Sequence, residues 1–103
     1  MVKIKISRQA QKDMRQIYDF ISKESLQNAD TLVEKFIIKI DSLSSFPERG
    51  KIVKEFSRPS IREVSVYKFR IIYKVSPRIV RIITIHHSSR LIINNPFLKN
   101  YLK

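Results

Sequence analysis

Four residues in the second half of the chain could bind an anion or transfer a proton: Arg70, His86, His87 and Arg90. A guanidinium group stabilises developing negative charge, and a histidine exchanges a proton near neutral pH. Together with Arg62, one histidine and these arginines could cleave RNA through a phosphorane-like transition state. Alternatively, the arginines are surface cations that bind an acidic partner, and His87 only fills space at the end of a sheet. On chemistry alone, the second interpretation is favoured.

Other kinds of chemistry lack the residues they need. Gly50 is the only glycine, so no phosphate-cradling loop can be built, and a chain with adjacent histidines and no cysteine has no plausible zinc set. Glu63 is the only carboxylate between residues 61 and 90, which argues against a paired-carboxylate mechanism. We expect neither a metal nor a cofactor.

Two predicted strands would position the four residues. Apolar side chains alternate over residues 69–75 and again over residues 79–87, and a tight break separates the two segments. In an antiparallel hairpin, the start of the first strand lies beside the end of the second, which brings Arg70 near His86, His87 and Arg90. The two histidines point to opposite faces, and a register slip of one residue would exchange them. The sequence therefore leaves open which histidine shares a face with Arg70.

The preceding chain predicts the rest of an α+β fold. A short strand is expected at about residues 2–6 and a two-helix hairpin at about 8–46, because apolar residues recur there at helical spacing. Further strands are expected within residues 51–89, including one over 51–56. We therefore predict one domain over residues 1–103, in which the N-terminal strand joins a twisted, mostly antiparallel sheet of about four strands that packs on the helices. A C-terminal segment, 91–103, follows, and its last residues, Phe97 to Lys103, are expected to form a helical turn or two, or to become ordered only with a partner.

The charge distribution indicates an anionic partner. The chain of 103 residues has 21 lysines and arginines against 9 aspartates and glutamates, a formal charge of +12. All nine carboxylates precede Val64, and the remainder carries only cations: Lys68, Arg70, Lys74, Arg78, Arg81, Arg90, Lys99 and Lys103. Such a one-sign field attracts nucleic acid or an acidic protein, although a basic surface without a specific partner is the alternative. With no apolar run of membrane-spanning length, no signal-peptide pattern and no cysteine, a cytoplasmic location is expected.

Three segments in a fixed order carry a family resemblance. They are the helical pair ending in FPERG, then IREVSVYKFRIIYKV, then VRIITIHHSSR. From about Ile4 to Arg90 the chain resembles the RelE/ParE superfamily of bacterial type II toxin-antitoxin toxins. The resemblance implies a small basic toxin held inactive by a partly disordered acidic antitoxin, which usually also binds operator DNA. The residues then expected to bind a partner are Lys68, Lys74, Arg81, Phe97 and Tyr101.

The RelE-like branch of the superfamily implies a ribosome-dependent ribonuclease that cuts mRNA. Arg70 and Arg90 match its two arginine positions, and His87 could replace a missing base. The lysines expected on the preceding strand are absent, since Arg62 stands among valines there, and Tyr101 is displaced from the expected tyrosine position. This branch is the alternative interpretation.

The ParE-like branch matches better. The chain has a long predicted helical hairpin, then a break at Phe46 and Pro47 followed by Arg49 and Gly50. ParE-like proteins are associated with DNA gyrase, whose cleavage complex they trap without being enzymes themselves. We therefore prefer a ParE-like toxin, with a third possibility that the chain is a toxin relic retained as an antitoxin-binding or DNA-associated regulatory module.

Overall fold

The computed structural model describes residues 1–99, which form two α-helices, five strands and one short 3₁₀ turn. The elements are β1 (Lys3–Ile6), α1 (Arg8–Ser22), α2 (Leu26–Ser42), β2 (Lys51–Ile52), β3 (Ile61–Val66), β4 (Phe69–Val75), β5 (Ile79–His87) and η1 (Ile92–Asn94). Within residues 1–99 neither helix is long and apolar enough to cross a membrane. Tyr101, expected to bind a partner, lies outside the described residues.

Each helix begins at a serine. The Ser7 hydroxyl accepts a hydrogen bond from the Ala10 N–H at 3.0 Å, and the Ser25 hydroxyl accepts one from the Asn28 N–H at 3.1 Å, so both caps satisfy a donor that the first turn leaves free. The predicted helical hairpin extended to residue 46, whereas α2 ends at Ser42. Beyond Ser42 the chain turns, and Ser44 exchanges hydrogen bonds with Val2 near the N-terminus.

The sheet has the strand order β1-β5-β4-β3-β2. The expected mostly antiparallel sheet with an N-terminal strand is confirmed, and it has five strands. β1 lies parallel to β5, and the other neighbours are antiparallel. A parallel neighbour requires a long crossover, and here the two helices and three strands between β1 and β5 provide it.

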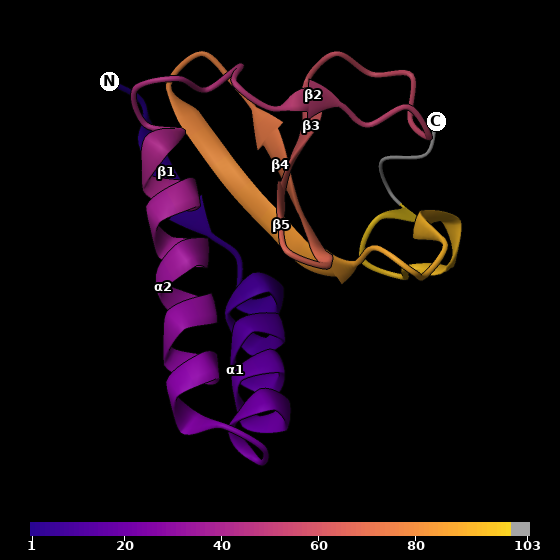
Figure 1. The fold of residues 1–103 in the computed structure, drawn as a ribbon. Helices are drawn as coiled ribbons and strands as arrows, with labels where there is room; N and C mark the ends of the chain where they lie inside the picture. The colour runs from indigo at the N-terminus through magenta and orange to yellow at the C-terminus, as the bar shows by residue number, and fades with distance from the viewer. Residues whose placement is uncertain (100–103) are drawn as a thin grey trace.

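The two faces of the sheet are covered by different parts of the chain (Figure 1). On one face the helices pack against the main core, which includes Phe36, Phe69 and Tyr73. We call the other face the outer face. A second, smaller core lies there and contains Val53, Phe56, Ile61, Ile72, Ile83, Ile92 and Leu98. Residues of the 53–60 loop and of the C-terminal segment thus cover part of the outer face.

The strand predicted over residues 51–56 is wrong beyond Ile52. Val53 and Phe56 are both buried in the second core, and the Phe56 N–H bonds to the Val53 carbonyl at 3.1 Å. Side chains three positions apart cannot share a face of a straight strand, so the backbone turns to bury both. This turn brings Glu55, which lies between them, to the outer face.

Candidate functional site

Arg70 lies on the outer face, in the second position of β4. The strand register pairs it with Ser65 on β3 and with His86 on β5. Because laterally paired residues of a sheet project to the same face, Arg70 and His86 are neighbours there. The predicted hairpin therefore brings Arg70 and a histidine together, and the histidine is His86.

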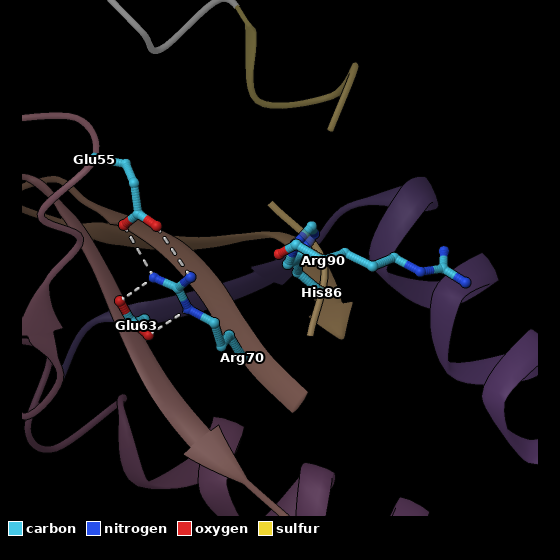
Figure 2. A network of polar contacts seen from close by, with 5 residues as sticks. All are labelled: Glu55, Glu63, Arg70, His86 and Arg90. Carbon is cyan, nitrogen blue, oxygen red and sulfur yellow. Dashed lines mark hydrogen bonds and ion pairs between the residues drawn. The ribbon is translucent and has the colours of Figure 1, made fainter. Parts of the chain in front are cut away.

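The Arg70 guanidinium group is enclosed by two carboxylates (Figure 2). Its Nε donates to Glu63 Oε1 at 2.7 Å and its Nη2 to Glu63 Oε2 at 2.6 Å. Its Nη1 and Nη2 each donate to a Glu55 oxygen at 3.2 Å. The Glu63 side chain is only 5% exposed and that of Arg70 15%. This geometry is the bidentate arrangement in which arginine binds carboxylates most strongly.

The cluster pairs one cation, Arg70, with two anions, Glu55 and Glu63. The hydrogen bonds that Arg70 donates to Glu63 raise the pKa of Arg70 further above its ordinary value, and those that it donates to Glu55 lower the pKa of Glu55. One guanidinium thus faces two carboxylates, so the three groups together have a net charge of about −1. Such a group repels a phosphate, so the arrangement favours a structural role for Arg70.

His86 fastens the C-terminal segment to the sheet. It is 6% exposed, its Nε2 lies 2.8 Å from the Arg90 carbonyl oxygen, and its Nδ1 lies 3.0 Å from Asn95 Nδ2. A carbonyl can only accept and the amide nitrogen can only donate, so in this geometry Nε2 donates to Arg90 and Nδ1 accepts from Asn95. Both ring nitrogens are therefore occupied by contacts with the segment that follows β5.

His87 does not face Arg70, contrary to the role considered for it as a base in that cluster. Its ring packs edge-on against Phe69 on the helical face, with centroids 5.2 Å apart, and its Nδ1 accepts a hydrogen bond from the Ser89 N–H at 3.1 Å. The reason is strand alternation, since His86 occupies the outer face and the next side chain must point to the opposite one.

The other two predicted arginines also lie apart from Arg70. Arg90 is exposed, and Figure 2 shows its side chain extending away from the carboxylates, so that only its backbone carbonyl contacts His86. Arg62 is paired with Tyr73 across β3 and β4, and its Nη1 donates to the Gly50 carbonyl at 2.9 Å. The residues predicted to be catalytic, Arg62, Arg70, His87 and Arg90, therefore do not form one cluster.

The partners of Arg70 were missed at the sequence level. Glu63 lies two residues before Ser65 on β3, so it faces Arg70 diagonally once the turn of the β3–β4 hairpin is known. The turn at residues 67–68 carries no glycine or asparagine to mark it. Glu55 had no sequence signal, because its position depends on how the 53–60 loop crosses the sheet. Within residues 1–99 no cluster of three or more metal-ligating side chains is found.

A second group of cations lies on the outer face near β1. Arg81 of β5 is paired laterally with Lys5 of β1 and Lys74 of β4. We call these three residues the basic row. Lys5 and Arg81 are exposed, and Lys74 is half-buried and has its own interactions. Of the other residues expected to bind a partner, Lys68 is exposed beside Tyr67, and Phe97 is half-exposed in the C-terminal segment.

Comparison with known proteins connects this arrangement to a family. Residues 4–92, which include both helices, β2 to β5 and all of β1 except Lys3, match the family described as "ParE toxin of type II toxin-antitoxin system, parDE". A solved structure titled "Chromosomal ParDE TA system from P. aeruginosa" superimposes with a TM-score of 0.70 at 20% sequence identity, covering 84% of this chain and 96% of that chain. At this identity the structural likeness shows the fold. No curated protein matches the chain.

Proposed function

Because the chain belongs to the ParE toxin family of type II toxin-antitoxin systems, we propose that it inhibits growth by binding DNA gyrase and that an acidic antitoxin neutralises it. In this proposal the toxin traps the gyrase cleavage complex and catalyses no reaction itself. Gyrase acts on DNA in the cytoplasm, so the same proposal places the toxin there.

The observation that favours a binding toxin over a ribonuclease is that the guanidinium group of Arg70 is already bonded to Glu55 and Glu63. An RNA-cleaving arginine must present free N–H donors to a phosphate, and here four donor contacts of Arg70 go to Glu55 and Glu63. The neighbouring His86 uses both ring nitrogens within the chain. Arg90 and His87, the other two residues of the ribonuclease interpretation, lie away from this pair.

A gyrase cleavage assay tests the proposed target. Purified protein is incubated with gyrase, supercoiled plasmid and ATP, and linear plasmid is measured after protein denaturation, with a reaction lacking gyrase as the control. We expect linear DNA to accumulate with toxin concentration only when gyrase is present. No linear DNA at toxin excess would overturn the gyrase proposal, and mRNA cleavage on programmed ribosomes would then be the next measurement.

The basic row supports the second half of the proposal, an acidic antitoxin. Like charges that lie directly opposite on neighbouring strands repel each other, so the Lys5–Arg81 pair costs stability in the free chain. An anionic polypeptide laid across the strands would remove this repulsion. Complementary charge of this kind mainly raises the association rate and is screened by salt.

Charge reversal tests the role of the basic row. The variant Lys5→Glu/Arg81→Glu is compared with Lys12→Glu on the exposed surface of α1, and the association rate with the antitoxin is measured at several salt concentrations. We expect at least a tenfold slower association for the double variant at low salt, converging with the wild type at high salt, and little change for Lys12→Glu. Equal rates for all three proteins would show that the antitoxin does not use this row.

A further inference from the structure

Tyr67 occupies a backbone conformation that a bulky residue seldom adopts. Residues 67 and 68 form the two-residue turn between the paired Val66 and Phe69, and the φ angle of Tyr67 is 54°. A positive φ at this turn position is normally provided by glycine, because a Cβ atom is strained there. The Tyr67 side chain is nevertheless 75% exposed, so it adds little to the core. Strain of this kind, at a residue that does little for packing, suggests a functional role.

A groove opens beside Tyr67. It has a volume of about 360 Å³ and lies between α2, the loop before β2 and the β3–β4 turn. Its lining residues, which define the Tyr67 groove, are Lys35, Ile38, Lys39, Ser42, Arg49, Ser65, Val66 and Tyr67. Ile38, one of the apolar residues of this groove, is 63% exposed.

The cations of the groove contrast with Arg70. Lys35, Lys39 and Arg49 line it, no carboxylate does, and within residues 1–99 none of the three forms an ion pair. Lys35 and Lys39 also lie four residues apart on α2, where like charges repel along a helix. The Tyr67 groove thus combines apolar side chains with cations that have no partner in the described chain.

We propose that the Tyr67 groove binds an acidic, amphipathic protein segment of gyrase, so that this inference rests on the function proposed above. An apolar side chain of that segment packs between Ile38 and Tyr67, and its carboxylates pair with Lys35, Lys39 and Arg49. The apolar floor favours a polypeptide over a nucleic acid backbone, which would need the cations but not Ile38 and Val66. Tyrosine and arginine are also the residue types that most often dominate the energetics of protein interfaces.

The substitution Tyr67→Gly separates binding from folding. It removes the ring and at the same time relieves the positive φ, so the melting temperature is expected to be equal or higher. The matched control is Phe20→Ala, which removes an aromatic ring of 73% exposure from α1, outside the groove. A second pair compares Lys35→Glu/Lys39→Glu with the control Lys12→Glu/Lys23→Glu. The control changes the net charge by the same amount, at exposed positions in α1 and at its C-terminus.

Each variant is tested for plasmid linearisation by gyrase, for affinity to gyrase without DNA, for affinity to the antitoxin, and for affinity to duplex DNA without gyrase. We expect Tyr67→Gly and Lys35→Glu/Lys39→Glu to need at least tenfold more protein for the same linear product and to bind gyrase at least tenfold more weakly, while the two controls match the wild type.

Linearisation and gyrase affinity equal to wild type in Tyr67→Gly would overturn the inference while leaving the proposed function intact. Loss of antitoxin affinity alone would assign the groove to the antitoxin, and loss of binding to duplex DNA alone would assign it to nucleic acid; either result overturns the inference. A wild-type protein that yields no linear DNA would overturn the proposed function and this assignment with it.

Discussion

Replacing Arg70 with methionine is expected to destabilise the fold by about 3–5 kcal/mol, because it leaves Glu63 as a buried charge without a partner. The Glu63 side chain is 5% exposed, and both of its oxygens accept hydrogen bonds from Arg70, at 2.7 and 2.6 Å. For a domain of this size, a loss of 3 kcal/mol lowers the melting temperature by roughly 12 °C or more.

The same reasoning predicts that removing both charges restores stability. In Arg70→Met/Glu63→Met the buried pair becomes an apolar contact of similar volume, which is neutral or stabilising in comparable cases. Glu55→Gln should cost less than about 1 kcal/mol, because Glu55 is 31% exposed and lies 3.2 Å from Arg70. The contrast between Glu63 and Glu55 therefore measures the effect of burial on the ion pair.

Urea unfolding of the wild type, Arg70→Met, Glu63→Met, Glu55→Gln and the double variant at pH 7, followed by circular dichroism, gives these free energies and the coupling between Arg70 and Glu63. We expect the double variant to recover most of the loss seen in Arg70→Met. If Arg70→Met lowers the free energy of unfolding by less than about 1 kcal/mol and shows no coupling to Glu63, the ion pair of Arg70 does not stabilise the fold. That result would refute the structural role and return Arg70 to the ribonuclease interpretation.

Three further predictions follow from other contacts. Arg70 lowers the pKa of Glu55, so the contribution of Glu55 to stability is complete above the ordinary glutamate pKa of 4.5 and is lost as the pH falls through the lowered pKa. The difference in unfolding free energy between wild type and Glu55→Gln should therefore shrink in acid. A constant difference from pH 7 to pH 3 would contradict this linkage. Tyr73→Phe removes the hydroxyl that accepts the buried Gly50 N–H at 2.9 Å and should cost about 1–3 kcal/mol in urea unfolding at pH 7. Because burial raises the pKa of Tyr73, the wild type should lose stability as the pH rises above 10, and the phenylalanine variant should lack that component. Asn95→Ala removes the donor to His86 and the acceptor of the Phe97 N–H, so hydrogen exchange should accelerate over residues 92–99 and remain unchanged in β4 and β5; uniform exchange rates would argue against this fastening role.

Periodicity and capping in the sequence determined the kinds of elements and their order. Ser7 and Ser25 cap the two helices, and the alternation over residues 69–75 and 79–87 matches β4 and β5. These signals are local, since each depends on residues within a turn or two of one another. The ordered segments also carried the resemblance that the family match over residues 4–92 confirms.

The contents of the site were decided by tertiary structure. Arg70, Glu63 and Glu55 meet only because a two-residue turn sets the register of β3 and β4 and the 53–60 loop folds over the outer face. The same register turns His86 toward Arg70 and His87 toward Phe69. Register and loop packing depend on contacts between residues distant in the chain, so composition and spacing could identify the charged residues but not which of them neutralise one another.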